Sequence, residues 1–157
     1  AKGICYATGK PLIAVNSLEA LVQVALEDFE AGILDLESLE DAKLLPMIDA
    51  RRMEVYCQLF DAQARPLSEV EAHVLTAESF AAERVQGRLV LFGNGAAKSK
   101  MLFTEPGVHY VDVTPSARGL VKPATEALKI SKFEDVAYFE PFYLKNFVAT
   151  SSSKKFF

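Results

Sequence analysis

The chain has 157 residues, of which 50% are hydrophobic and 24% are charged. This composition is that of an ordinary globular protein and excludes collagen-like and intrinsically disordered chains. The net charge of −4, from 17 basic and 21 acidic residues, creates no broad basic field that would attract nucleic acid. The chain is therefore not expected to bind RNA by itself.

The two cysteines, Cys5 and Cys57, lie far apart in the sequence. Their number and spacing fit neither a disulfide framework nor the ligand set of a zinc site, so a reducing, cytoplasmic location is predicted. No apolar run approaches the roughly 20 residues that a membrane-spanning helix needs. No signal peptide, with a charged and then an apolar segment, opens the chain, and no membrane association is expected.

The first third of the chain predicts a helix, a strand and a second helix. The opening residues are typical of the last turns of a helix that ends at Gly9, and we expect that something preceded them. The apolar run at 11–16 predicts a buried strand. Asn16 and Glu19 have the spacing of an N-cap and capping box, and an amphipathic helix should follow them. The acidic segment 30–43 is expected to be a connector.

Two strand-like runs follow and predict an antiparallel hairpin. Residues 44–48 are continuously apolar, and residues 53–60 alternate between polar and apolar side chains. The corner between the two strands is the charged segment 49–52. This pairing predicts that the sheet contains antiparallel strands.

The remainder alternates between strands and helices. After a short strand, a helix is predicted at 78–85, and a buried strand with a glycine-rich turn at 88–100. A third strand is expected at 108–113. A further helix is expected at 116–130, and Pro123 should kink it. The order of elements predicts an α/β protein with a mixed sheet flanked by helices.

The turn formed by Gly93, Asn94 and Gly95 is the weak candidate for a cofactor-binding site. A strand, a glycine turn and a helix N-terminus together can present backbone N–H groups to a phosphate. The spacing does not match a P-loop, however, and the third glycine of a dinucleotide fingerprint would fall on Lys98. The glycines can equally serve backbone conformation and close packing.

Metal and nucleophile chemistry have little support in the sequence. His73 and His109 are separated by 36 positions, and neither has another ligand at metal spacing. No G-x-S-x-G elbow or similar nucleophile context is present. No catalytic residue, no metal ligand and no cofactor is therefore predicted.

The charged corner has two interpretations. Its arginines could hold a substrate by bidentate hydrogen bonds, or its opposite charges could pair locally to stabilise a hairpin. Acid–base work needs a perturbed pKa in a cleft, which the sequence does not indicate, and this favours the structural interpretation.

Four blocks in one order carry a family resemblance: "AKGICYATGKPLIAVNSLEAL", "PMIDARRMEVY", "LVLFGNGAAK" and "EPFYLK". Together they resemble the TsaB (YeaZ) proteins of bacterial tRNA threonylcarbamoyladenosine biosynthesis. The resemblance implies the actin-like, Hsp70-like ATPase fold, in which each of two lobes carries a ribonuclease-H-like sheet. The family's "AIDTS"-like strand and "GPGSFTGLR"-like turn are not in this sequence, so the first lobe is expected to be largely missing. The implied parts are the tail of the first lobe at 1–42, the second lobe at 43–148 and a flexible tail at 149–157.

The resemblance also implies a function. TsaB proteins are non-catalytic partners of TsaD, a paralogue that transfers a threonylcarbamoyl group to the adenosine beside the tRNA anticodon, and the ATPase TsaE completes the assembly. TsaD would bind through the first lobe, and this binding is expected to be impaired here because most of that lobe is missing. A homodimer is an open alternative. The chain would contact tRNA only indirectly, through the assembly. The hairpin residues Asp49, Arg51 and Glu54 would lie at the interlobe groove and make supporting contacts across it.

Two rival functions stay open. One is an ATP-binding enzyme of the actin-like superfamily, with the Gly93 turn at the adenosine and Asp49 facing a metal. The other is the metal-dependent glycoprotease of the older family label, which would require zinc. The metal-binding His pair of TsaD is not found in this sequence, which disfavours the second.

Overall fold

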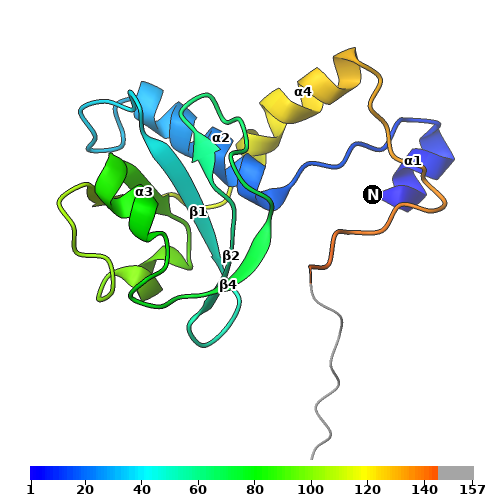
Figure 1. The fold of residues 1–157 in the computed structure, drawn as a ribbon. Helices are drawn as coiled ribbons and strands as arrows, with labels where there is room; N and C mark the ends of the chain where they lie inside the picture. The colour runs from blue at the N-terminus through cyan, green and yellow to red at the C-terminus, as the bar shows by residue number, and fades with distance from the viewer. Residues whose placement is uncertain (145–157) are drawn as a thin grey trace, which may run out of the picture.

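The computed structural model describes residues 1–144, so the predicted tail at 149–157 and the end of the predicted second lobe lie outside the described residues. The described part has a central twisted sheet with helices on both of its faces (Figure 1). The sheet has six strands in the order β4-β2-β1-β5-β6, with β3 also paired to β1. The predicted mixed α/β architecture is therefore confirmed.

The centre of the sheet is β1 (Lys43–Asp49), which pairs antiparallel with β2 (Glu54–Cys57). On its far side β2 pairs antiparallel with β4 (Glu71–Val74). The other neighbour of β1 is β5 (Leu89–Phe92), which is parallel to it, and β6 (Val108–Tyr110) is parallel to β5. The apolar β1 and β5 lie in the middle, because strands covered on both faces need apolar side chains on both.

The predicted strand 53–60 forms in two pieces. After β2 the chain leaves the ladder for two residues and returns as β3 (Phe60–Asp61), which pairs antiparallel with the start of β1. Strands β2 and β3 pair with β1 in the same antiparallel register, so they are two parts of one interrupted strand. The predicted hairpin is thus confirmed.

The prediction of a capped helix at the front of the chain is confirmed by α2 (Ser17–Glu30). The Asn16 side chain accepts a hydrogen bond of 2.8 Å from the backbone N–H of Leu18. The strand predicted at 11–16 is wrong, because within it only Leu12 forms an isolated bridge, to Glu134. An apolar run forms a strand only where a neighbouring strand can pair with its backbone N–H and C=O groups. The segment between α1 and α2 lies away from the sheet and, within the described residues, has no such strand beside it (Figure 1).

The remaining helices are short. They are α1 (Lys2–Thr8), α3 (Ala81–Gln86) and α4 (Val121–Lys129), with single 3₁₀ turns at η1 (Ala96–Ser99) and η2 (Ala117–Leu120). As predicted, α1 ends at Gly9 in the left-handed conformation. The predicted helix at 116–130 forms as η2 followed by α4. Pro123 lies in the first turn of α4, where a helical N–H has no intrahelical partner, and the change from 3₁₀ to α-helix falls just before it, between Leu120 and Val121.

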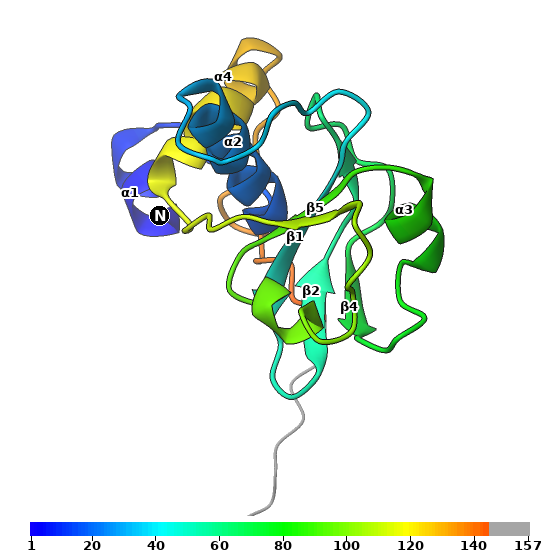
Figure 2. The ribbon, with the colours of Figure 1, turned by 90° about the vertical axis from the view of Figure 1, so that its left-hand side faces the viewer.

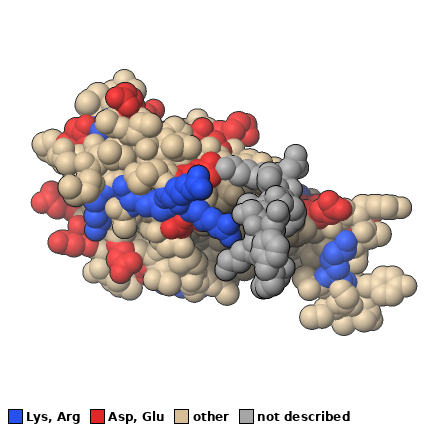
Figure 3. Space-filling model, turned by 90° about the horizontal axis from the view of Figure 1, so that it is seen from below, with Lys and Arg blue, Asp and Glu red and all other residues tan. Residues whose placement is uncertain are grey.

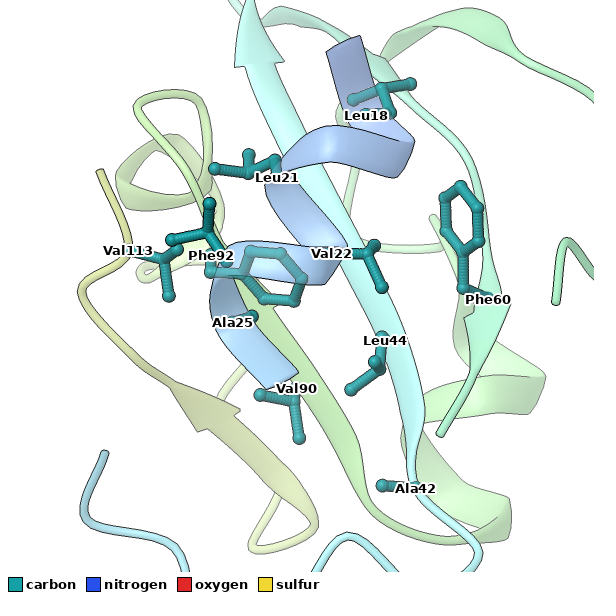
Figure 4. Close-up of a cluster of buried hydrophobic side chains, with 11 residues drawn as sticks. Leu18, Leu21, Val22, Ala25, Ala42, Leu44, Phe60, Val90, Phe92 and Val113 are labelled. Atoms are coloured by element: carbon teal, nitrogen blue, oxygen red, sulfur yellow. The ribbon is translucent and has the colours of Figure 1, made fainter. Parts of the chain in front are cut away.

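The apolar core has two layers, one on each face of the sheet. Alternate residues of β1 and β5 point toward α2, and Figure 4 shows Leu44, Val90 and Phe92 facing Leu21 and Val22 of that helix. The residues between them face the other side, where they pack with Phe103 and the region around η1. Figure 2 shows α2 and α3 on opposite sides of the strands. Helix α2 therefore packs on one face of the sheet and forms one of the two core layers with it.

The segment α1 lies apart from this core and has no buried residue. The Lys2 ammonium donates hydrogen bonds of 3.0 Å to the carbonyl oxygens of Ala137 and Phe139. Figure 1 shows this pair of segments beside the far end of α4, away from the sheet. Within residues 1–144, every helix is too short or too polar to span a lipid bilayer.

Candidate functional site at the β1–β2 corner

The corner between β1 and β2 is a tight turn with an unusual backbone. Arg51 and Arg52 have φ angles of 74° and 47°, in the left-handed region that is uncommon for residues other than glycine. The Asp49 carboxylate accepts a 2.6 Å hydrogen bond from the Arg51 backbone N–H, and the Ala50 N–H donates to the Glu54 carbonyl at 3.1 Å. An aspartate that bonds to the backbone two residues on holds such a turn in place.

The glycine-rich turn lies against this corner, because β5 is the parallel neighbour of β1 and both strands end at the same edge. The Asn94 side-chain oxygen accepts a 2.9 Å hydrogen bond from the Asp49 backbone N–H. A Cβ on Gly93, whose φ is 90°, would stand 2.5 Å from the Met47 carbonyl oxygen, and one on Gly95 would stand 3.0 Å from Val55. Conformation and close approach thus account for both glycines.

Lys98 joins the two halves of the site. Its ammonium donates to the Asp49 carboxylate at 2.6 Å and to the Glu54 carbonyl at 2.8 Å, and its side chain is only 16% exposed. The hydrogen bond from Lys98, followed by the one from the Arg51 N–H, holds the pKa of Asp49 below its ordinary value.

The backbone N–H groups that would bind a phosphate are largely occupied. Those of Gly95, Ala96 and Lys98 donate to the carbonyl oxygens of Met47, Gly93 and Gly95, at 2.9, 3.1 and 3.2 Å. A phosphate-binding loop needs such groups to point at the ligand. The arrangement is that of an internally bonded turn.

The structure brings together the residues of both sequence-derived candidate sites. Asp49 and Asn94 are in direct contact, and the side chain of Arg51 is exposed while Glu54 is half-buried. The contact of Asp49, Arg51 and Glu54 with another lobe stays a prediction. Lys98 was missed as a functional residue by the sequence analysis, although a lysine one turn after a glycine-rich loop is a recognisable signal.

The two histidines lie on opposite edges of the sheet, His73 on β4 and His109 on β6. The His73 ring contacts the Ser79 hydroxyl at 2.8 Å and the Glu71 carboxylate at 3.1 Å, a chain of groups that resembles a hydrolytic triad. Ser79 is only 6% exposed, however, and its oxygen accepts the Thr76 backbone N–H at 2.9 Å. This chain therefore stabilises the turn before α3.

Metal ligands do not gather in the described part of the chain: no group of three or more His, Cys, Asp or Glu side chains there could hold a metal ion. The Cys57 thiol is buried, and burial, with a smaller effect from Glu71, raises its pKa to about 12. This thiol is protonated at neutral pH.

The sheet order and its coverage define the class of protein. Three antiparallel strands followed by two parallel ones, with helices on both faces, form an α/β lobe with a mixed sheet. The model of the family described as "TsaD: tRNA N6-adenosine threonylcarbamoyltransferase" matches residues 1–142, and the chain belongs to this family.

Solved structures agree with this assignment. An uncharacterized protein from Pseudomonas aeruginosa, described as similar to the peptidase YeaZ, matches with a TM-score of 0.66 and 20% identity over 92% of this chain and 63% of its own. YeaZ from Pseudomonas aeruginosa matches with a TM-score of 0.60 and 22% identity over 87% of this chain and 60% of its own. The search of the curated proteins found no match. The resemblance to YeaZ is confirmed for family and fold, and this chain spans less than two thirds of either matched structure.

Proposed function

We propose that this chain is part of a TsaB-type protein, a non-catalytic subunit that supports the TsaD transferase in threonylcarbamoylation of the tRNA adenosine next to the anticodon. The YeaZ-like fold is compatible with this role, and the family description places the chain among proteins of the same tRNA modification. The protein would act in the cytoplasm.

The observation that carries the proposal is the internal use of the reactive groups at the β1–β2 corner. The Asp49 carboxylate is bonded to Lys98 and to the Arg51 N–H, and the N–H groups of Gly95, Ala96 and Lys98, in and after the glycine turn, donate to nearby carbonyls. A catalytic carboxylate or a phosphate-binding loop keeps these groups available for substrate. Here they hold β1, β2 and β5 together, as a scaffold requires.

The expected partners follow from this role. We propose that TsaD binds through first-lobe surface that includes α1, that TsaE joins the assembly, and that a homodimer is the competing arrangement. Residues 1–42 and 43–148 would belong to the first and second lobes, with α2 packing on the second-lobe sheet in this structure. Asp49, Arg51 and Glu54 would contact the first lobe across the groove.

The test uses the full-length protein with its cognate TsaD, and measures tRNA modification with and without it. Modification should depend on its presence. A variant with Ile4→Glu and Tyr6→Glu on exposed α1 should weaken the pull-down of TsaD, while Lys129→Gln on α4 is the matched surface control. Full modification in the absence of the protein would end the proposal.

The ATP-binding alternative is tested separately by calorimetry with the same protein. We expect no heat of binding at millimolar ATP, because the N–H groups of Gly95, Ala96 and Lys98 already donate to carbonyl oxygens of the protein. Saturable binding that Asn94→Ala abolishes would favour an ATP-dependent enzyme instead. Zinc in elemental analysis of the purified protein would favour the peptidase.

A further inference from the structure

The glycine turn contains an asparagine–glycine pair, Asn94 and Gly95, whose chemistry the proposed function does not use. Such a pair loses ammonia readily, because glycine has no Cβ and its backbone nitrogen can approach the asparagine side chain. The Gly95 nitrogen bonds to the Asn94 Cγ, the Cγ–Nδ2 bond breaks, and ammonia leaves with the amide proton. Water then opens the succinimide ring to aspartate or to isoaspartate, in which the main chain runs through the side chain.

In the folded chain both reacting groups are engaged in hydrogen bonds to β1. The Gly95 backbone N–H donates to the Met47 carbonyl oxygen at 2.9 Å, and Gly95 is buried. The Asn94 side-chain oxygen accepts the Asp49 backbone N–H at 2.9 Å. A base does not reach an amide proton that is buried and hydrogen-bonded. The Gly95 nitrogen therefore cannot attack while the corner is closed.

Local opening of the corner is expected to cost less than unfolding of the sheet. Its closure depends on Lys98, whose ammonium donates to the Asp49 carboxylate at 2.6 Å and to the Glu54 carbonyl at 2.8 Å. Arg51 and Arg52 have left-handed backbones, and opening relieves that strain. Regions with few buried contacts open before the core strands do.

Positive charge around the corner favours the reaction once the corner is open. Figure 3, which views the molecule from below Figure 1, shows Lys and Arg side chains gathered in a band on this face. Removal of the Gly95 amide proton leaves a negatively charged nitrogen, and nearby cations stabilise a negative charge. Lys98 and Lys100 follow Gly95 closely in the chain.

The isoaspartate product does not fit the closed corner, because it adds a carbon atom to the main chain between Gly93 and Gly95. A Cβ on Gly93 would stand 2.5 Å from the Met47 carbonyl oxygen, and one on Gly95 would stand 3.0 Å from Val55. The turn thus has no room for an extra atom on either side. Aspartate, in contrast, keeps the main chain unaltered and has an oxygen that can accept the Asp49 N–H.

We propose that Asn94 is a deamidation site that the closed corner protects, and that conversion to isoaspartate keeps the corner open. Deamidation is then an irreversible record of opening, because the modified turn cannot form again. The inference is independent of the proposed function, since it rests on the hydrogen bonds and the packing of the turn.

The first experiment incubates the 157-residue chain in mildly alkaline buffer with and without guanidinium chloride. Peptide mass spectrometry follows the loss of Asn94, and enzymatic methylation follows isoaspartate. Deamidation should be at least about tenfold slower in the native chain, because its rate follows the population of the open corner. Lys98→Gln should raise the native rate severalfold and leave the rate in denaturant nearly unchanged. Lys129→Gln, which removes the same charge from exposed α4, should change neither rate.

The second experiment compares thermal melts after the denaturant is removed. The chain aged to complete deamidation, in which isoaspartate predominates, is compared with the variant Asn94→Asp aged in the same way. The isoaspartate chain should melt about 4 °C or more below the variant, as overpacking of a turn in a chain of this size implies. Both chains carry the added negative charge, so the comparison isolates the lengthened main chain.

Four results would contradict the inference. Equal rates in the native and the unfolded chain would exclude protection, and an Asn94 that stays intact in denaturant would exclude the site. An unchanged native rate in folded Lys98→Gln would exclude control by the corner. A refolded isoaspartate chain as stable as Asn94→Asp would show that the corner accepts the product. If Lys98→Gln does not fold, the native and unfolded rates of the unaltered chain still decide whether the corner protects Asn94.

Discussion

Similar apolar residues occur in two regions, the sheet with α2 and the outlying segments around α1. They are buried in the first region and exposed to solvent in the second. In the sheet and α2, Val22, Leu45 and Phe92 are each 0% exposed. In the outlying part, Ile4 on α1 is 69% exposed, and Ile130 just after α4 is 73% exposed. The difference shows that hydrophobic content by itself does not locate the core of this chain.

The comparison also separates two sources of helical order. Helix α2 has 14 residues and buries one face on the sheet, whereas α1 has 7 residues and buries none. Isolated helices shorter than about 12 residues are marginal in water. Helix α1 therefore depends on local contacts such as those of Lys2, and it should contribute little to global stability.

The largest difference in stability between the two regions is expected when one buried aromatic side chain, Phe92, is removed. Phe92→Ala should lower the free energy of unfolding by about 3–5 kcal/mol, since it leaves a cavity between β5 and α2. Ile4→Ala, on exposed α1, should change it by less than about 0.5 kcal/mol. Urea unfolding followed by circular dichroism measures both, and similar losses would contradict the division into core and periphery.

The reactivity of the two cysteines toward an alkylating reagent tests the same difference between the core and the outlying segments. Cys57, in the core, has a pKa raised to about 12 from 9.0, so its thiolate fraction in mild alkali is reduced about a thousandfold. Cys5, on α1, is half-buried. Iodoacetamide followed by peptide mass spectrometry should label Cys5 in the native protein and Cys57 only after unfolding. Equal labelling rates in the native state would show that the core opens readily.

Two glycines with positive φ differ in their surroundings. An added Cβ at Gly93 would meet the Met47 carbonyl oxygen at 2.5 Å, whereas one at Gly9 would meet nothing within 4 Å. Gly93→Ala should therefore destabilise by about 2–4 kcal/mol, from backbone strain and overpacking together. Gly9→Ala should carry only local strain at the end of α1. Thermal melts distinguish the two, and a harmless Gly93→Ala would mean that the corner can relax.

The smallest effect concerns acid stability at the corner. Because the pKa of Asp49 is lowered in the folded state, its stabilising contribution is complete above the unfolded value near 3.8 and is lost as the pH falls through the folded value. Asp49→Asn should lower the urea midpoint at neutral pH, and the curves of variant and unaltered chain should converge in acid. Exposed Asp35→Asn is the control. A difference that is constant across pH would exclude the ion pair as the cause.

Much of the sheet could be predicted from the sequence because local patterns and tertiary structure agree there. The apolar run at 44–48 and the alternation at 53–60 became the paired strands of the hairpin. The run at 11–16 has an equally strong pattern but no strand edge beside it, and local sequence carries no information about that edge. Pro123 falls in the first turn of α4, and the kink expected there stays a prediction.

The candidate site was predictable in its parts but not as a whole. Both the charged corner and the glycine turn were identified, since each has a local signal. Their contact depends on the parallel pairing of β1 with β5, which joins residues about 45 positions apart. Lys98 gained its role only through that pairing, so sequence patterns alone did not reveal it.

The two ends of the described chain hold each other. Lys2 bonds to carbonyls near residue 138, and Leu12 bridges to Glu134. The leading residues are therefore anchored to the segment near residue 135 and not to the sheet. A fluorescent tag on α1 would accordingly report on the segment near residue 135 rather than on the sheet.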